Sequence, residues 1–337
     1  MSAQQLEAIL QMAAQNPPPP QATPAQLRAW FDASNSRMPL AQGLPIQTLR
    51  IPNGAGGTMA AELLSTPQAD PRRLVIYYHA GGFVFGSLTS HRALCSYLAQ
   101  FSGAQVLNVD YRLAPEHPAP AAHDDALAAY QWALANGYAA SAIALMGDSA
   151  GGNLALSTAV RARNQGLPLP AAIVALSPAL DLASEGASHH TVDDPFITRE
   201  LMGFFNAMYV PGGDVRSPTV TPFYSADLQG LPPVQLQVGG WERLRDDAVT
   251  MAARLKAAGV QADCTVWDGM VHCWQLFAPA LDEALASLEQ AGRFIAAHQR
   301  TAVAAARASS GLLGRTALPY ISAINTTYLS LAARAAF

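Results

Sequence analysis

The feature that most constrains the fold is a glycine-flanked serine that stands between a strand pattern and a helix pattern. Residues 142–146 form a short apolar run that predicts a strand, and residues 152–160 predict a buried helix. Between them, residues 147–151 read Gly-Asp-Ser-Ala-Gly, a G-x-S-x-G pentapeptide. Small residues let the chain turn sharply enough to hold a serine hydroxyl out at the top of a sheet. The pattern predicts a nucleophile elbow at Ser149; the alternative is a tight turn that needs only small residues.

A second strand pattern, upstream of the elbow, ends in a glycine loop. Residues 74–78 predict this strand, and residues 79–83 continue as His-Ala-Gly-Gly-Phe. Backbone N–H groups in such a loop can converge on a developing negative charge, because no side chain blocks their approach. A flexible turn is the alternative, and the expected place of this strand beside the elbow strand favours anion binding. His79 is expected to organise the loop through a backbone hydrogen bond and not to act as a base.

A nucleophilic serine needs a base, and His272 is the best-placed histidine. Residues 262–267 predict the last strand, and His272 lies on the loop that follows it, from which a side chain can reach back over the sheet edge. The chain has 8 histidines. The others lie in less suitable places, which are helix starts, a proline-rich turn, a variable insertion and a surface helix: His91, His117, His123, His189, His190 and His298.

Three carboxylates compete for the role of the acid that orients the base. All follow the penultimate strand pattern, residues 234–239. Asp246 and Asp247 fall in the first turn of a predicted helix, where acids complement the helix dipole whatever the chemistry. Glu242 lies in the loop before that helix, where its carboxylate can point along the upper edge of the sheet. Position therefore favours Glu242.

Taken together, these segments resemble the bacterial members of the hormone-sensitive lipase-like esterases, within the α/β-hydrolase superfamily. The resemblance implies that Ser149 is the nucleophile and His272 the base, in the chain order Ser, acid, His that this superfamily uses. It also implies that the backbone amides of Gly81, Gly82 and Ala150 form the oxyanion hole. The matching segments follow the family's order: residues 79–83, 110–116, 147–153, 177–182, 242–247 and 269–272.

The chain departs from the family pattern at two positions. Ala80 stands where the family usually has the first of three glycines, which is tolerable if φ at this position is negative. The family's acid is most often an aspartate before Pro-Leu, whereas this chain has Glu242 there, as one branch of the family does. A glutamate is one methylene longer, so its backbone must sit slightly further from the histidine.

The resemblance implies a serine carboxylesterase that hydrolyses short-chain acyl esters through an acyl-enzyme, because the family's capped pocket is small. Phe83, Phe85 and Trp274 are the candidate pocket walls. Two alternatives stay open on the same fold: an amidase or aryl-amide deacylase with the same triad, and a non-catalytic small-molecule binder. The presence of His272 disfavours the binder.

Composition fits one enzyme domain without a cofactor. The chain has 337 residues, of which 50% are hydrophobic and 13% charged, enough to bury a large core. The net charge of −4 lacks the excess of positive charge that is typical of nucleic-acid-binding proteins. Cys95, Cys264 and Cys273 are an odd number without a CxxC, so we expect no disulfide framework. We also expect no metal, because no His/Cys/acid pattern suggests zinc. The N-terminus lacks a signal-peptide pattern, which predicts a cytoplasmic protein.

Alternating strand and helix patterns predict an α/β fold: an eight-stranded, mostly parallel sheet with helices on both faces and a helical cap. Residues 1–45 are expected to form the N-terminal cap helices, at about 4–14 and 24–36, and residues 46–300 the catalytic domain. Within it, residues 183–231 contribute to the cap. The expected strands are 47–52, 59–64, 74–79, 105–109, 142–147, 172–177, 234–239 and 262–267, and the expected helices 91–102, 119–135, 151–164, 243–258 and 279–298.

Residues 301–337 form a C-terminal extension that the resemblance does not explain. Its apolar run is broken by Arg315, Pro319 and Asn325, so it is a poor candidate for a membrane span, which needs ~20 mostly apolar residues. A surface helix on the domain and an oligomer contact are the favoured interpretations, and disorder is a further alternative. The oligomer contact leaves a homodimer as an open alternative.

Overall fold

The computed structural model describes residues 2–312, with an eight-stranded sheet at its centre. The strand order is β1-β2-β4-β3-β5-β6-β7-β8. β2 runs antiparallel to both of its neighbours, and every other pairing is parallel. The α/β fold and its mostly parallel eight-stranded sheet are therefore confirmed. The strands are β1 Ile46–Pro52, β2 Thr58–Leu64, β3 Asp70–Tyr78, β4 Ala104–Val109, β5 Ile143–Asp148, β6 Ala172–Leu176, β7 Val234–Gly239 and β8 Ala262–Trp267.

Helices cover both faces of the sheet, and the sequence of the strands shows why. All residues of β5 and β6 are buried, as expected for parallel strands covered on both sides. Alternate residues of β3 enter different cores: Ile76 packs with residues of α4, α5 and α8, whereas Val75 and Tyr77 pack with residues of α3 and α9. The helices are α1 Ser2–Gln15, α2 Pro24–Asn35, α3 Leu88–Ser102, α4 Ala121–Ala135, α5 Ala150–Asn164, α6 Ser188–Thr191, α7 Arg199–Tyr209, α8 Arg245–Ala257 and α9 Asp282–Leu312. Short 3-10 turns occupy Ala140–Ala142, Pro222–Tyr224 and Trp274–Phe277.

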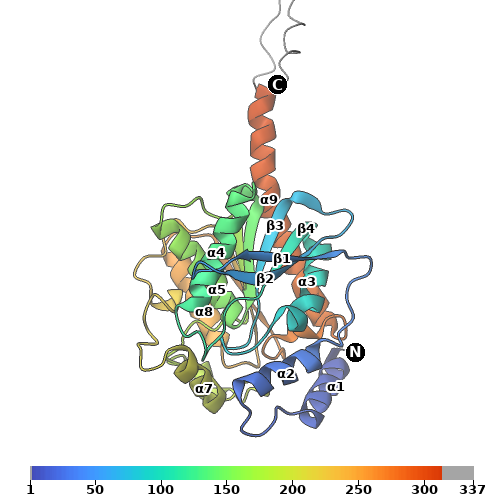
Figure 1. Cartoon of the computed structure of the whole chain (residues 1–337), viewed down its shortest axis with the longest axis vertical. Helices are drawn as coiled ribbons and strands as arrows, with labels where there is room; N and C mark the ends of the chain where they lie inside the picture. Colours follow the sequence, from blue (N-terminus) through green and yellow to red (C-terminus); the bar gives the residue numbers. More distant parts are fainter. Residues whose placement is uncertain (1, 313–337) are drawn as a thin grey trace, which may run out of the picture. The chain divides into compact units, whose positions relative to one another are not determined.

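The two N-terminal helices and α7 gather on one side of the sheet, at the bottom of Figure 1. Thr23 and Gln26 form a capping box that starts α2, with a proline at its first turn. Arg28 of α2 donates to the carbonyl oxygens of Val84 (2.8 Å) and Ala114 (2.8 Å), which ties this helix to the glycine loop after β3. The helices outside the sheet layers are thus attached at the loop predicted to bind an oxyanion.

The last helix is longer than expected, since α9 continues through residue 312 and so enters the predicted C-terminal extension. Residues 313–337 of that extension lie outside the described residues. Among the residues that the structure describes, no helix is both long and apolar enough to cross a membrane.

Candidate active site

Ser149 lies at the sharp turn between β5 and α5, in the position expected of a nucleophile elbow. Its φ of 51° falls in the left-handed region that non-glycine residues rarely adopt. The turn is possible because Gly151 has no side chain: a Cβ there would lie 1.8 Å from the carbonyl oxygen of Tyr78, at the end of β3. The amide of Ser149 donates to Leu176 O on β6 (2.9 Å), which fixes the elbow to the neighbouring strand.

His272 and Ser149 are brought together across the upper edge of the sheet. His272 Nε2 lies 3.1 Å from Ser149 Oγ, within hydrogen-bond distance. The loop that carries His272 follows β8, as expected, and its Met270 carbonyl accepts from the amide of Trp241 (2.9 Å). The side chain of His272 is 9% exposed, so most of it is shielded from solvent. This geometry suits a base that takes a proton from the serine.

Glu242 is the carboxylate that the structure places against the other nitrogen of this imidazole. Its Oε2 lies 2.9 Å from His272 Nδ1, and its Oε1 accepts from Ser177 Oγ (2.9 Å) and from the amide of Gly239. A carboxylate here keeps the proton on Nδ1 and leaves the Nε2 lone pair facing the serine. Burial raises the pKa of Glu242, and the hydrogen bond and charge of His272 oppose that rise.

The surroundings of His272 favour its protonated form. Burial alone would lower its pKa, but the hydrogen bond and charge of Glu242, followed by the charges of Asp194 and Asp148, outweigh it and raise the pKa above the ordinary value. The imidazolium that forms when a base takes a proton is therefore stabilised in this site.

The glycine loop after β3 has backbone conformations that favour glycine over every other residue. Gly81 has φ 120° and Gly82 has φ 59°, both in the left-handed region. A Cβ on Gly82 would lie 2.4 Å from the ring of Phe205 of α7, so this helix sits directly on the loop. Ala150 is the first residue of α5, and its N–H has no acceptor within the helix. Ala80 is not among the residues with positive φ, so alanine meets no backbone penalty there.

His79 has the organising contacts expected of it. Its Nδ1 lies 2.8 Å from Ala80 O, and its ring stacks on Tyr111 at 4.1 Å between centroids. The hydroxyl of Tyr111 donates to His79 O (2.7 Å), which gives residues 110–116 a structural part in holding the loop. Burial lowers the pKa of His79 to about 3, so its imidazole is neutral.

The three residues predicted to line the pocket lie in different environments. Phe85 is partly exposed and packs between Phe31 of α2 and Phe205 of α7, with centroids 4.8 and 5.4 Å away. Phe83 is buried and stacks on Tyr209 at 3.9 Å. The prediction for Trp274 is corrected: this side chain is fully buried in the core on the α9 side, and its indole N–H donates to Glu283 O (3.2 Å).

Phe31 and Phe205 are the aromatic residues that the sequence analysis did not assign to the site. Each contacts Phe85, and Phe205 also lies against Gly82. The only signal in the sequence was the pair of phenylalanines at positions 204 and 205 within the insertion, and nothing local indicated which of them faces the loop.

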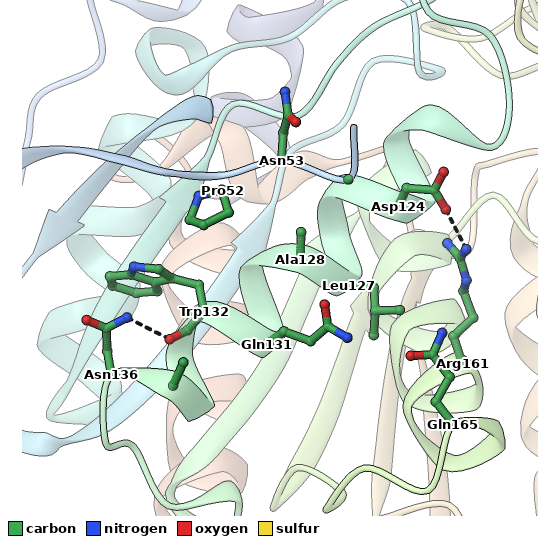
Figure 2. A pocket seen from close by; sticks show the side chains of 12 residues that line it. Pro52, Asn53, Asp124, Leu127, Ala128, Gln131, Trp132, Asn136, Arg161 and Gln165 are labelled. Carbon is green, nitrogen blue, oxygen red and sulfur yellow. Dashed lines mark hydrogen bonds and ion pairs between the residues drawn. The ribbon is translucent and has the colours of Figure 1, made fainter. Parts of the chain in front are cut away.

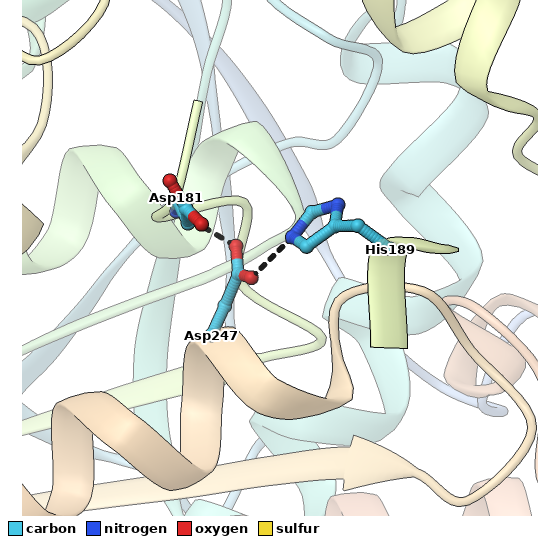
Figure 3. Close-up of side chains that lie close together, drawn as sticks. All are labelled: Asp181, His189 and Asp247. Carbon is cyan, nitrogen blue, oxygen red and sulfur yellow. Dashed lines mark hydrogen bonds and ion pairs between the residues drawn. The ribbon is translucent and has the colours of Figure 1, made fainter. Parts of the chain in front are cut away.

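Asp247 has a partner that the helix-dipole argument did not foresee. Its Oδ1 lies 2.6 Å from His189 Nε2, and its Oδ2 accepts from the amides of Leu180 (2.9 Å) and Asp181 (2.8 Å). Figure 3 shows these side chains converging from α6, α8 and the segment after β6. Asp246 accepts instead from the amide of Ser188 (2.8 Å). Both aspartates thus hold the 183–231 insertion in place, which the dipole explanation missed.

The structure also brings together a His/acid cluster that the sequence did not reveal. Donor atoms of Asp181, His189 and Asp247 lie within 4.8 Å of one another, the arrangement of a candidate metal site. The carboxylate oxygens are already engaged, since Asp181 accepts from the Tyr224 hydroxyl and from the amides of residues 185 and 186. A metal would have to break this set, so the cluster fits a structural hydrogen-bond network better than a metal centre.

A groove elsewhere on the surface is lined by none of the triad residues. Its volume is about 660 Å³, and its walls come from α4, α5 and the turn after β1. Figure 2 shows Arg161 ion-paired with Asp124 at one end and Trp132 at the other. Its lining includes no nucleophile–base pair, so the groove does not compete with Ser149 as the site of chemistry.

Comparison with known proteins agrees with this architecture. Residues 75–276 match the family described as the alpha/beta hydrolase fold. The chain is similar to an acetyl-hydrolase of Streptomyces hygroscopicus, 40% identical over 71% of this chain and 80% of the relative, and to the carboxylesterase/phospholipase LipF of Mycobacterium tuberculosis, 39% identical over 75% and 69%. A crystal structure of an esterase from the bacterial hormone-sensitive lipase family superposes with a TM-score of 0.83 at 41% identity, covering 88% of this chain and 98% of that one.

Proposed function

The chain belongs to the alpha/beta hydrolase fold family as a bacterial hormone-sensitive lipase-like esterase, and we propose that it hydrolyses short-chain acyl esters with a Ser149–His272–Glu242 triad. The carboxylic ester hydrolase class follows from the relatives. Beyond that class, we propose the identity of the three catalytic residues, the acyl-enzyme route and the short acyl length. Its main support is the continuous contact from Ser149 Oγ through His272 to a fully buried Glu242.

The first half-reaction forms the acyl-enzyme. Neutral His272 takes the hydroxyl proton at Nε2 as Ser149 Oγ attacks the acyl carbonyl carbon, and Glu242 stabilises the imidazolium. The negative charge on the former carbonyl oxygen is stabilised by the amides of Gly81, Gly82 and Ala150. The tetrahedral intermediate then collapses, the ester C–O bond breaks, and His272 returns the proton to the leaving alcohol.

Water completes the cycle. His272 removes a proton from a water molecule as that molecule attacks the acyl carbon of the acyl-enzyme. The bond to Ser149 Oγ then breaks, the serine regains its proton from His272, and the carboxylic acid leaves. No cofactor is needed for either half.

The proposed acyl pocket is short because aromatic rings crowd the glycine loop. We place α1, α2 and residues 183–231 in the cap, where Phe31 and Phe205 meet Phe85. Phe205 lies so close to Gly82 that a long acyl chain has little room beside the oxyanion site. An acetyl-hydrolase among the relatives and an esterase structure soaked with p-nitrophenyl butyrate are consistent with short acyl groups.

The test is a panel of p-nitrophenyl esters from acetate to decanoate, with the matched p-nitroanilides. We expect the highest kcat/KM on acetate or butyrate, a fall at longer chains, and much slower cleavage of the anilides. Higher rates on the anilides than on the matched esters would make the chain an amidase on the same triad.

Ser149→Ala in the same panel tests the nucleophile. We expect kcat to fall about 10⁴-fold or more, because the members of a triad act as a unit. Circular dichroism checks that the fold is intact. A variant that keeps more than about a tenth of wild-type activity would show that Ser149 is not the nucleophile.

A further inference from the structure

Ser177, the first residue after β6, has a backbone conformation that favours glycine. Its φ of 41° lies in the left-handed region, where a residue with a side chain is strained. The residue is fully buried, and its amide donates to Gln237 O of β7 (2.7 Å), which fixes this conformation between two parallel strands. A serine at a position whose backbone suits glycine better indicates that its hydroxyl has a use.

The hydroxyl of Ser177 joins the two loops that carry the proposed acid and the proposed base. It donates its proton to Glu242 Oε1 (2.9 Å), and it accepts from the amide of Cys273 (3.3 Å), the residue after His272. Oε1 is the carboxylate oxygen that does not contact the imidazole, because His272 Nδ1 lies 2.9 Å from Oε2. One buried hydroxyl therefore connects the segment after β7 to the loop after β8.

Residues close to Ser177 in the chain hold the third member of the proposed triad. Leu176 O accepts from the amide of Ser149 (2.9 Å), and the amide of Ala179 donates to Ser149 O (3.0 Å). Residues 176–179 thus contact the nucleophile through their main chain and the acid through the Ser177 side chain. This segment is a common support of the nucleophile and the acid.

We propose that Ser177 is a positioning residue of the triad, whose hydroxyl holds Glu242 Oε1 so that Oε2 stays against Nδ1 of His272. The inference rests on the proposed function. A glutamate side chain is long and rotatable, so its carboxylate keeps one orientation only where both oxygens have fixed partners. The amide of Gly239 also donates to Oε1, but from the acid's own segment. The Ser177 hydroxyl ties the acid to the strand that also holds the nucleophile.

Loss of the Ser177 hydroxyl should resemble a partial loss of Glu242. The carboxylate would be free to turn away from the imidazole for part of the time, which weakens its hydrogen bond to Nδ1. Because Glu242 raises the pKa of His272, a weaker contact lowers that pKa. The charges of Asp194 and Asp148 also raise it, and both residues are left unchanged in the variants below.

The experiment compares Ser177→Gly and Ser177→Ala with the wild type on p-nitrophenyl butyrate, by kcat, KM and the pH profile of kcat/KM. Both variants remove the hydroxyl, but only glycine also relieves the strained backbone. We expect kcat to fall about fivefold to thirtyfold in both, with KM within about threefold, because a hydrogen bond to a charged group is lost. The limb that rises with pH should move to lower pH by about 0.3 to 1 pH unit.

Ser287→Ala is the matched control. Ser287 of α9 is as fully buried as Ser177, and its hydroxyl donates to Gln237 Oε1 (2.5 Å) and accepts from Gln275 Nε2 (2.9 Å). It therefore also joins β7 to the segment after β8, but neither of these partners is a triad residue. Its loss should lower the free energy of unfolding in urea, while kcat stays within about twofold of the wild type and the limb stays in place.

A double-mutant cycle with Glu242→Gln decides whether Ser177 acts through the acid. If it does, adding Ser177→Gly to Glu242→Gln should lower kcat by less than about twofold further. Losses that multiply in full would overturn the proposal, and so would a limb that is unmoved or moves to higher pH in the single variants. Wild-type kcat in Ser177→Gly beside a loss in Ser177→Ala would show that the backbone matters and not the hydroxyl, which also overturns it.

Circular dichroism checks the fold of each variant. If one of the two Ser177 variants does not fold, the other decides; if neither folds, the hydroxyl serves the fold and the positioning role is overturned. An inactive wild type overturns the proposed function and the inference with it. A wild type whose activity is lost in Ser149→Ala but kept in Ser177→Gly overturns the inference alone.

Discussion

The segment that follows β7 carries two carboxylates that each contact a histidine, and the two pairs differ in what surrounds them. Glu242 contacts His272 at 2.9 Å, and Asp247 contacts His189 at 2.6 Å. Both carboxylates are fully buried, and both partners raise the pKa of their histidine against the effect of burial. By composition, distance and electrostatics alone, either pair could be the orienting half of a triad.

The second ring nitrogen separates the two pairs. His272 presents its Nε2 to Ser149, and its side chain is 9% exposed. The Nδ1 of His189 is buried without a hydrogen-bond partner among the described residues, and the side chain is fully buried. A histidine–carboxylate pair becomes a base only where its free lone pair meets a hydroxyl that a substrate can reach. The His189–Asp247 pair instead fastens the insertion to α8.

Among changes within the two pairs, Glu242→Gln is expected to have the largest effect, because it removes the charge of the first pair and keeps its shape. The amide cannot stabilise the imidazolium or enforce the tautomer, so kcat should fall about 10²- to 10⁴-fold with a smaller change in KM. Steady-state kinetics on p-nitrophenyl butyrate measures this. If instead Glu242→Gln stays active and Asp247→Asn is the inactive variant, Glu242 is not the orienting acid.

Asp247→Asn should break the second pair and affect stability more than catalysis. Removing one partner of a buried pair leaves unsatisfied groups, and we expect a loss of about 3 kcal/mol in the free energy of unfolding. Urea denaturation measures it, with kcat in native buffer within about threefold of wild type. Asp246→Asn is the matched control, because its side chain is 26% exposed and its loss should cost at most about 1 kcal/mol. Equal losses in the two variants would count against a special role for the buried pair.

The smallest expected effect is on the pH dependence of kcat/KM. It tests whether His272, and not His189, is the histidine whose titration sets the rate. Since the pKa of His272 is raised above the ordinary 6.5, the neutral base accumulates only as pH rises through that higher value, and kcat/KM should rise with it. His189→Asn should leave the midpoint of this limb in place, because His189 has no hydroxyl to deprotonate. A midpoint that moves with His189, or a rate flat between about pH 5 and 9, contradicts the assignment.

The sequence predicted the strands and loops that depend on local residue patterns. It failed for side chains whose role depends on a partner far away in the chain. The strands around Ser149 were expected within a few residues, because buried parallel strands are short apolar runs bounded by glycine. The loop position of Glu242 singled it out among three acids, and the structure places it at His272. Asp247 was attributed to the helix dipole because its partner, His189, lies in an insertion with no periodic pattern. Trp274 was misplaced because a residue just after a loop gives no sign of the face it packs on.

The contact of Gly151 with the end of β3 has a consequence for how this scaffold can diversify. The spacing between the serine and the glycine loop is set by main chain against main chain, since no side chain fits between them. Substitutions in α2 or α7 can therefore change the side chains around the glycine loop without altering the spacing between Ser149 and the amides proposed to form the oxyanion hole. If the proposed function holds, selection for a new ester can act on the side chains of these helices, while the main-chain spacing at Ser149 stays the same.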